Sequence, residues 1–311
     1  MRISCITVFC NEEFRLDNWK RYYQEYKDEL YLHVIVNNGS SEDTPLLKYS
    51  FPNSIVLESQ GGNLLAAYNI GLQYCLRDAS IDAIMQITND VRFKENAISE
   101  MYDLLFSDAS LAVVGPVLLR KDSDVVESFG IDYPCSTIDR GGQQTFPYQG
   151  NCLHEIPISV RRVSYVPAGT ILMKRSAIEK MGFQDETLIM YCDERDMAIR
   201  LYKLGYYEAV TKKAVAWHQH INRPGCISRS LYAPFFSSRN CIYLIRKHSN
   251  LFWAINQSVK VIVYMSLLML YHLLCSGEDH KLRSDKAAIY GTLYGLFLRM
   301  ETYPKWLSCK Y

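Results

Sequence analysis

Short apolar segments alternate with longer amphipathic segments over the first two thirds of the chain. Residues 1–9 form an apolar run that ends in polar residues and predicts a buried β-strand. Apolar and aromatic residues then recur near helical spacing over residues 14–27, and residues 30–36 are again an apolar run typical of a strand. A strand, a helix and a second strand predict one βαβ unit.

The same alternation recurs further along the chain. It predicts strands at residues 54–57, 81–88, 111–119, 163–166 and 170–174, and helices at residues 64–76, 96–106, 176–181 and 193–204. The predicted fold class is therefore α/β, with an open, mostly parallel sheet flanked by helices. Residues 121–162 lose this periodicity among glycines and prolines. They predict a long excursion over the sheet edge, of the kind that often lines a binding site.

The chain changes character near residue 239. Segments 242–246, 251–275 and 286–300 are apolar-rich and helical in pattern. We therefore expect a boundary within residues 222–238, which divides an α/β domain at residues 1–230 from a helical tail at residues 231–311.

Net charge separates the same two parts. The whole chain has 34 Lys and Arg against 33 Asp and Glu, and a net charge of +1 argues against a nucleic-acid binder. Residues 239–311 carry ten bases and four acids, a net charge of +6, and the remainder carries −5. A basic, apolar, helical tail favours peripheral attachment to an anionic membrane surface.

The length of the apolar stretch qualifies that expectation. The longest uncharged apolar stretch of the tail, residues 261–275, is shorter than the roughly 18 residues of a membrane-spanning helix, so we expect it to lie in the interface or pack on the body. The alternative is a helical packing subdomain or a homodimer contact.

The ten cysteines are scattered without a CxxC pair or a preceding secretory leader, which is typical of a cytoplasmic protein.

Two polar loops follow predicted strands. Residues 36–44 include Asn37, Asn38 and Ser40, and small polar residues at the C-terminal end of a parallel strand suit a nucleobase or a phosphate. An ordinary turn that caps the next helix is the other interpretation of this loop. Asn63 follows two glycines at a helix start, where capping is its expected role when it is taken alone.

A carboxylate and two histidines are candidates for a metal site. Asp90 follows a buried strand in the middle of the sheet, where it could hold a divalent cation that bridges a diphosphate; capping a turn is the alternative. His218 and His220 end a β-like run and share one face of it, as metal ligands would. Isolated surface or core histidines are nevertheless common.

Three acids open the helix predicted at residues 193–204. Asp193, Glu194 and Asp196 lie where the helix dipole favours negative charge, so a purely structural role is one interpretation. Adjacent acids also repel each other, and one of a crowded pair can acquire a raised pKa suited to general-base catalysis.

Taken together, these segments resemble the family-2 glycosyltransferases of the GT-A fold, especially the branch of rhamnosyl- and galactofuranosyl-transferases of bacterial surface-polysaccharide synthesis. The resemblance covers about residues 1–246. It rests on residues 7–12 as the first strand, 36–44 as a D-N-G-S-x-D-x-T-like nucleotide loop, 63–71 as an N-x-G-x-A-x-N-x-G-like helix start, 87–91 at the position of the D-x-D motif, 193–200 as an E-D-x-D-x-x-x-R-like helix, and the pair Trp217-His218.

The resemblance implies an inverting transfer of a hexose from a UDP- or dTDP-sugar to a saccharide acceptor, often lipid-linked, at the inner face of the cytoplasmic membrane. Glu194 would be the catalytic base and Asp193 would orient the base or the acceptor, while Asp90 and His218 would hold Mg²⁺ or Mn²⁺. Donor-binding positions carried over from the family are Thr7, Phe9, Asn11, Asn37, Asn38, Ser40, Asn63, Asn69, Asn89 and Gly169.

The sequence departs from the family pattern at three points. Asn37 replaces the usual base-contacting Asp, Thr88 replaces the first acid of D-x-D, and the acid pair is in the order Asp-Glu. These departures leave a second interpretation open, a catalytically degenerate nucleotide-sugar-binding partner protein. A nucleotidyltransferase would need a Gly-rich phosphate loop with a basic residue after the first strand, and residues 9–13 have neither.

Overall fold

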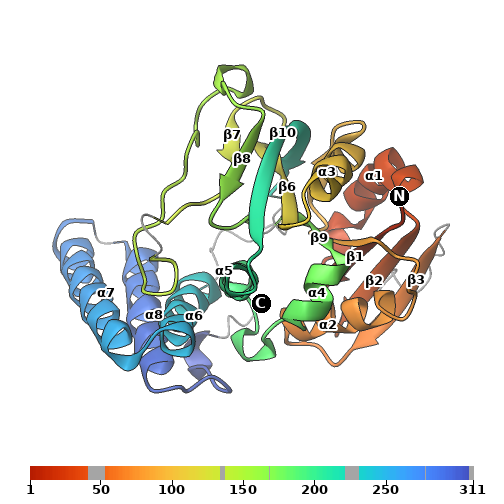
Figure 1. Cartoon of the computed structure of the whole chain (residues 1–311). Coiled ribbons are helices and arrows are strands. Elements are labelled where there is room, and N and C mark those ends of the chain that lie inside the picture. Colours follow the sequence, from red (N-terminus) through yellow and green to blue (C-terminus); the bar gives the residue numbers. More distant parts are fainter. Residues whose placement is uncertain (41–52, 134–136, 168, 221–230, 277, 308–311) are drawn as a thin grey trace. The chain divides into compact units, whose positions relative to one another are not determined.

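The computed structural model describes residues 1–40, 53–133, 137–167, 169–220, 231–276 and 278–307 (Figure 1). The chain forms two compact units. The first comprises residues 1–132, 144–186 and 200–224, and the second comprises residues 133–143, 187–199 and 225–311. The tail therefore shares a unit with the segment that carries Asp193 and Glu194.

A ten-stranded sheet forms the first unit, in the order β3-β2-β1-β4-β9-β6-β10-β5, with β7 beside β6 and β8 beside β10. Its strands are β1 (Ile3–Phe9), β2 (Leu32–Asn38), β3 (Ser54–Ser59), β4 (Ala83–Ile87), β5 (Val91–Phe93), β6 (Leu111–Arg120), β7 (Val126–Ser128), β8 (Val160–Val163), β9 (Thr170–Lys174) and β10 (Tyr207–His218). The predicted α/β sheet is confirmed. Strands β5 and β7 were not predicted, and β8 begins and ends three residues earlier than expected.

The parallel and mixed parts of the sheet are separate. Strands β1 to β4 pair in parallel, as expected. Strand β9 lies between β4 and β6 and is antiparallel to both. The excursion after β6 returns the chain to the sheet at the end where β6 finishes, so β9 has to run in the opposite direction. The sheet is therefore mixed in this half, and not mostly parallel throughout.

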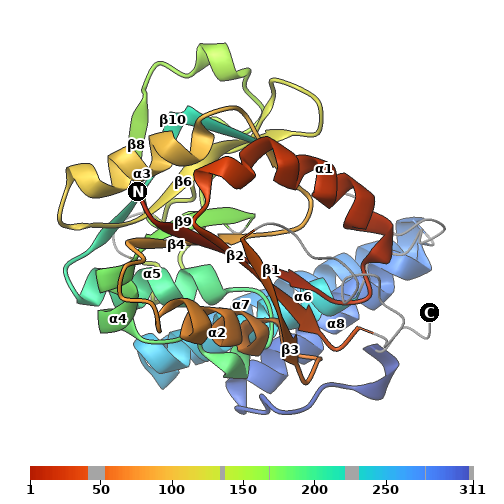
Figure 2. The same cartoon turned by 90° about the vertical axis from the view of Figure 1, so that its right-hand side faces the viewer.

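Helices cover both faces of the sheet (Figure 2). Helices α1 (Leu16–Tyr26) and α3 (Ala97–Ser107) lie on one face, and α2 (Leu64–Cys75) and α4 (Arg175–Met181) lie on the other. Side chains alternate along β1, so that Ile3 and Cys5 pack in the core beneath α1 and α3. Ile6 faces α2, where a Cβ at Gly71 would lie 2.6 Å from its Cγ2. Gly71 therefore permits the close approach of α2 to the sheet.

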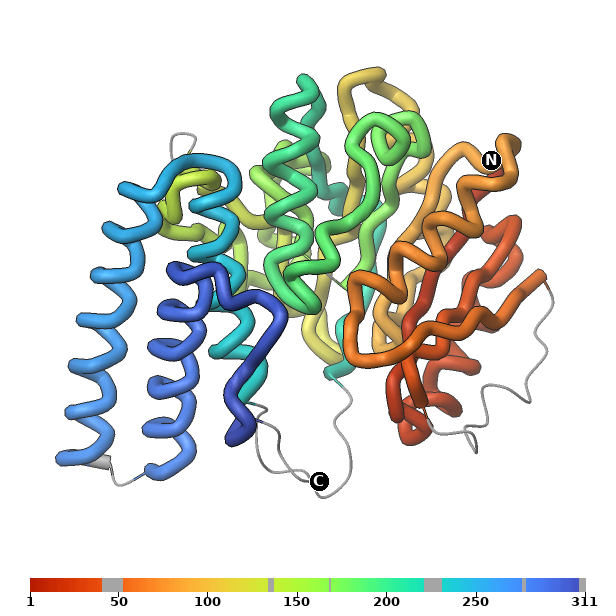
Figure 3. The backbone as a smooth tube through the Cα atoms, turned by 90° about the horizontal axis from the view of Figure 1, so that it is seen from below, coloured from red at the N-terminus to blue at the C-terminus, as the bar shows by residue number. Residues whose placement is uncertain are grey.

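Three long helices dominate the second unit and pack side by side (Figure 3). They are α6 (Tyr232–His248), α7 (Leu251–Tyr271, continued by a π-helical turn at His272–Ser276) and α8 (Asp279–Leu296). Gly291 and Gly295 of α8 lie against α6, and a Cβ at either glycine would be 2.2 Å from the carbonyl oxygen of Phe235 or Arg239. Small residues four apart thus let two helix backbones touch.

Helix α7 is exposed along much of its length. Within the described residues, Leu251–Cys275 is long and apolar enough to cross a membrane by length and composition alone, and only 6% of its most apolar window is buried. Residues 261–275 were expected to be too short to span a membrane. The helix also continues on the N-terminal side of Lys260, and the whole of Leu251–Cys275 is long enough. The remaining long helix, α5 (Asp193–Lys203), contains the boundary between the two units.

Candidate active site

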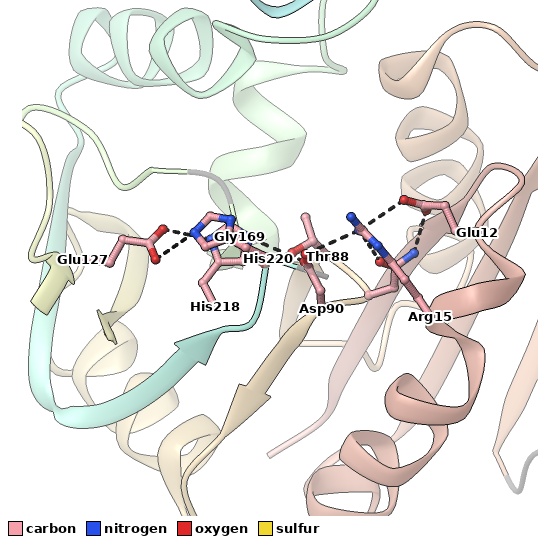
Figure 4. A network of polar contacts seen from close by, with 9 residues as sticks. Glu12, Arg15, Thr88, Asp90, Glu127, Gly169, His218 and His220 are labelled. Carbon is pink, nitrogen blue, oxygen red and sulfur yellow. Dashed lines mark hydrogen bonds and ion pairs between the residues drawn. The ribbon is translucent and has the colours of Figure 1, made fainter. Parts of the chain in front are cut away.

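Asp90 and His218 are brought together by strand pairing in the first unit. The short strand β5 starts directly after Asp90 and pairs antiparallel with β10, in a register that sets Val91 opposite His218. His218 Nε2 lies 3.5 Å from Asp90 Oδ1 (Figure 4). The two cation ligands expected from separate segments are therefore neighbours.

Two cationic groups surround the Asp90 carboxylate, which is 5% exposed. Arg15 Nη1 lies 3.4 Å from its Oδ2, and His218 faces its other oxygen. Burial raises the pKa of Asp90, but the bond to His218 and the charges of His218 and Arg15 outweigh it and lower the pKa to about 2. Asp90 is thus ionised at neutral pH.

Glu127 of β7 contacts two histidines, His218 at the end of β10 and His220 just after it. Its Oε1 lies 2.9 Å from His218 Nδ1, and its Oε2 lies 2.9 Å from His220 Nε2. The two imidazole rings are 3.8 Å apart between centroids. Burial lowers the pKa of His218, but bonds to Asp90 and Glu127 outweigh it and raise the pKa to about 9.

Glu12, Arg15 and Asn89 form a second network beside Asp90; Figure 4 shows Glu12 and Arg15 next to Asp90. Asn89 donates to Glu12 Oε2 at 2.7 Å and accepts from Arg15 Nη1 at 2.9 Å, while Arg15 pairs with Glu12 at 3.1 Å. Burial is the main cause of a raised pKa at Glu12. The amide of Asn89 is therefore occupied within the protein and orients Arg15 next to Asp90.

Thr88 and Gly169 join β4 to the start of β9. The Thr88 N–H donates to the carbonyl of Gly169 at 2.8 Å, and its hydroxyl donates to the same oxygen at 3.3 Å. Gly169 has φ +135°, a conformation that strongly favours glycine. Thr88 thus connects strands at the position where the family carries an acid.

The nucleotide-loop asparagines, Asn37 and Asn38, are the last two residues of β2. Asn37 donates to Glu58 Oε2 at 2.9 Å and accepts the Ser40 N–H at 3.1 Å, and Asn38 accepts from the Ser59 hydroxyl. The Ser40 hydroxyl accepts the Asn11 N–H at 2.9 Å. The rest of this loop, residues 41–44, lies outside the described residues.

The other expected donor positions make internal contacts. Thr7 and Phe9 are fully buried, against His33 and Trp19 respectively. Asn63 caps α2 by accepting from two backbone N–H groups, which confirms its capping interpretation, and Asn69 bonds to Gln184 and Glu186. Any donor contact at Thr7 or Phe9 would therefore fall to backbone atoms.

The acid pair of the second unit stands at the start of α5. Burial raises the pKa of Asp193 well above its usual range, and the charge of the adjacent Glu194 raises it further. Asp196, one turn further on, is buried and accepts from Lys247 at 2.8 Å and from His248 at 2.7 Å. The protonated form of Asp193 is thus favoured, whereas Asp196 pairs with the charge of Lys247.

Two residues of α6 hold the segment that precedes this acid pair. Asn240 donates its amide to the carbonyls of Leu188, Met190 and Tyr191, at 2.9, 2.7 and 2.9 Å. Arg239, fully buried, donates to the carbonyls of residues 187, 188 and 300. Ile189, Tyr191 and Cys192 all have positive φ, near 66°, so this turn is strained and needs such support.

The same contacts alter the view of the basic tail. Arg239 donates to carbonyls inside the unit, Arg246 bonds to the Leu296 carbonyl, and Lys247 pairs with Asp196. Part of the +6 charge therefore stabilises the tail itself and is not available to a surface.

Sequence reasoning missed Glu12, Arg15 and Glu127. Glu12 and Arg15 follow the first strand, in a turn whose charges were the available signal. Glu127 belongs to the excursion at residues 121–162, where no periodicity marks it. Asp90 and His218 offer a carboxylate and an imidazole, ligand types that suit Mn²⁺ and also accommodate Mg²⁺. Among the described residues, Glu127, His218 and His220 also lie close enough together to form a candidate metal-binding group.

Comparison with known proteins adds the fold. No protein-family model and no curated protein matches the chain. A structure of GalNAc-T7 with UDP, GalNAc and Mn²⁺ superposes with a TM-score of 0.62 at 14% identity, over 98% of this chain and 59% of that one. The chain has a GT-A fold. It thus spans little more than half of GalNAc-T7.

A second match agrees with the first. The mannosyltransferase PcManGT from Pyrobaculum calidifontis, in complex with GDP-Man and Mn²⁺, superposes with a TM-score of 0.55 at 12% identity, over 96% of this chain and 88% of that one. At such identities the likeness concerns the fold alone. Function has to be argued from the residues of this chain.

Proposed function

We propose that this GT-A protein is an inverting glycosyltransferase that moves a sugar from a UDP- or dTDP-sugar to a saccharide acceptor. The observation that carries the proposal is the convergence of Asp90 and His218, 3.5 Å apart, from two segments far apart in sequence. Both structural neighbours were solved with Mn²⁺ and with a nucleotide or nucleotide sugar. A carboxylate held ionised beside an imidazole suits the same chemistry.

Asp90 and His218 would hold the divalent cation, Mg²⁺ or Mn²⁺. When bound, the cation supplies positive charge that stabilises the leaving diphosphate. Arg15 adds a fixed positive charge at the same place, 3.4 Å from Asp90. Arg15 would attract the diphosphate directly, so that its charge stabilisation depends less on a cation that has one acid fewer to hold it where Thr88 replaces that acid.

Glu194 would take the proton from the acceptor hydroxyl as that hydroxyl attacks the anomeric carbon. Burial and the adjacent Glu194 raise the pKa of Asp193, which favours its protonated form. A protonated Asp193 can donate a hydrogen bond to Glu194 and so orient an ionised base. Gly169, which has no side chain, would leave room for the donor sugar.

The decisive experiment measures donor turnover by the purified chain. A transferase binds one nucleotide sugar more tightly in the presence of Mn²⁺, seen as a thermal shift, and hydrolyses or transfers its sugar. The degenerate partner protein would bind the same donor and leave it intact. Turnover that is equal with Mn²⁺ and with excess chelator would contradict the cation site.

The acceptor is proposed to be lipid-linked, in surface-polysaccharide synthesis at the inner face of the cytoplasmic membrane. Helix α7 supports this with an exposed apolar stripe whose members recur every three or four residues: Phe252, Ile255, Val259, Val263, Leu267, Leu270 and Leu274. Phe252 is 70% exposed and Leu267 is 61% exposed. A stripe of this kind buries favourably in the acyl boundary, and the nearby Lys260 suits anionic headgroups.

Flotation with vesicles that contain anionic lipid tests the membrane contact. The full chain should float, and the double variant Val263→Glu/Leu267→Glu should remain in solution. The matched control, Tyr202→Glu/Leu204→Glu, places the same charges on exposed apolar residues of another helix and its end. Equal flotation of all three proteins would contradict the proposal. Loss of a dimer in the first variant would favour the homodimer alternative.

A further inference from the structure

Glu127 is the residue of the site that nothing in the sequence pattern marked. It lies on β7, which pairs with the end of β6 through Leu118 and Ser128. Its backbone carbonyl accepts a hydrogen bond from Gln149 at 3.1 Å. Each of its carboxylate oxygens faces a different imidazole, at 2.9 Å in both cases. The carboxylate is therefore fixed at both oxygens and cannot rotate without losing a contact.

Both ring nitrogens of His218 face carboxylates. Nδ1 lies 2.9 Å from Glu127, within hydrogen-bond distance, and Nε2 lies 3.5 Å from Asp90 (Figure 4). An ionised carboxylate only accepts hydrogen bonds, so the closer contact with Glu127 places hydrogen on Nδ1. The hydrogen that a cation held by Asp90 would replace is therefore the one on Nε2. Once it has left, the Nε2 lone pair would face that cation.

We propose that Glu127 is a positioning residue, which fixes the tautomer and orientation of His218 for the cation of the donor site. The inference rests on the proposed function and adds a residue to it. Imidazole ligands of metals commonly donate their second N–H to a carboxylate, which raises ligand basicity. His220 supports the arrangement by occupying the other oxygen of Glu127 and by packing 3.8 Å from the His218 ring.

The position of Glu127 also gives the excursion at residues 121–162 a role. Strand β7 is its first regular element, and it brings one carboxylate to the end of β10, some ninety residues further along the chain. A change elsewhere in the excursion that moved β7 would therefore alter cation affinity without touching a ligand.

Titration of the full chain with Mn²⁺ alone, followed by calorimetry or electron paramagnetic resonance, tests the inference. Glu127→Leu, which keeps the side-chain bulk and removes both acceptors, should weaken Mn²⁺ binding about 10- to 100-fold. Glu127→Gln keeps one acceptor and should fall between this variant and the wild type. The control Glu155→Gln removes an equal charge from the same excursion, at a carboxylate that bonds to the backbone N–H of Cys152. It should bind Mn²⁺ like the wild type.

A second measurement needs no variant. The ¹⁵N chemical shifts of His218 in the metal-free wild type, in the alkaline range where the ring is neutral, should show hydrogen on Nδ1 and none on Nε2. The opposite tautomer would overturn the inference even if Glu127→Leu failed to fold.

The outcomes separate the two levels of the argument. If Glu127→Leu binds Mn²⁺ as tightly as the wild type does, Glu127 has no positioning role, and the proposed function still stands. A wild type that neither binds Mn²⁺ nor turns over a donor would remove the proposed function itself. Direct ligation of the cation by Glu127 would free Nδ1 of His218, and a metal-bound spectrum without the Nδ1 hydrogen bond would also overturn the inference.

Discussion

Two groups of carboxylates in this protein experience opposite electrostatic surroundings. Asp90, in the first unit, is buried but lies beside His218 and Arg15, and its pKa falls to about 2. Asp193, in the second unit, is partly buried beside another acid, and its pKa rises well above its usual range. Burial acts in the same direction on both, so the sign of the neighbouring charge decides the outcome.

A third carboxylate makes the same point with a neutral partner. Glu208 of β10 is 5% exposed and accepts a hydrogen bond from the Val166 N–H at 2.8 Å. Burial raises its pKa to about 8, and this hydrogen bond only reduces the rise. A buried acid that binds a cation must be ionised, and here only the acid with positively charged neighbours has a lowered pKa. A buried acid that exchanges a proton needs a raised pKa, which burial alone can supply.

Removing Asp90 should have the largest effect. Asp90→Asn takes away the ionised ligand, and we expect Mn²⁺-dependent turnover to fall by about a thousand-fold or more, because charge stabilisation by a cation contributes several kcal/mol to such reactions. The control is Asp82→Asn, at the opposite end of β4. Steady-state kinetics of both variants would make the comparison, and comparable losses would place the effect on the strand and not on the site.

The acid pair of α5 should respond asymmetrically. Glu194→Gln removes the proposed base, and turnover should fall by about a hundred- to a thousand-fold while donor binding stays within a few-fold. Asp193→Asn imitates the protonated acid that the structure favours, and should keep much of the activity. If Asp193→Asn were instead the more damaging change in a transfer assay, the roles within the pair would be reversed.

Loss of the Asn240 side chain should destabilise the turn before α5 in the second unit and leave the Asp90 site of the first unit unchanged. Asn240→Ala removes one donor from three carbonyls of the strained turn, of which only Leu188 keeps the hydrogen bond from Arg239, and this should cost about 1–3 kcal/mol of unfolding free energy. Denaturant unfolding measures this loss, and Asn256→Ala, a partly exposed amide of α7, is the control. Turnover should fall, because the turn leads into the acid pair, while Mn²⁺ affinity at Asp90 stays the same. A parallel loss of Mn²⁺ affinity would show that the two regions are not independent.

Glu208 should give the smallest effect, seen only as a pH dependence. Its pKa is raised from 4.5 to about 8, so the folded chain keeps a proton that the unfolded chain releases. The stabilisation is complete below about pH 4.5, declines as pH rises, and is lost above about pH 8. Thermal unfolding of Glu208→Gln should lack this decline. A wild type and variant with parallel melting curves across that range would show that Glu208 is ionised in the folded state.

Local patterns were enough to predict the elements that support the site. The apolar run of β1 and the alternation around α2 depend on side-chain periodicity, which is written in consecutive residues. Asp90 and His218 were each recognisable from their own segments, as a polar residue after a buried strand and a histidine at the end of another. Their proximity was implied by family resemblance and not by the pattern itself.

Glu127 and the orientation of β9 could not be obtained in this way. Glu127 reaches His218 because β7 pairs with β6, and such pairing depends on long-range register that periodicity does not encode. Strand β5 spans three residues, too few to show an alternation, yet it aligns Asp90 with β10. Arg239 and Asn240 lie at the point where the predicted tail changes character, and only the packing of α6 shows that they hold the turn before α5.

The two glycines of α8 affect how mutational data on this protein should be interpreted. Gly291 and Gly295 lie where any side chain would meet a carbonyl of α6 at 2.2 Å. In a library that samples every codon and selects for activity, both positions should therefore appear as intolerant as Asp90, although they contact no ligand. Selection for activity alone would count them among the catalytic residues. Selection for abundance in the same library would separate them, because substitutions at the glycines would deplete the protein and Asp90→Asn would not.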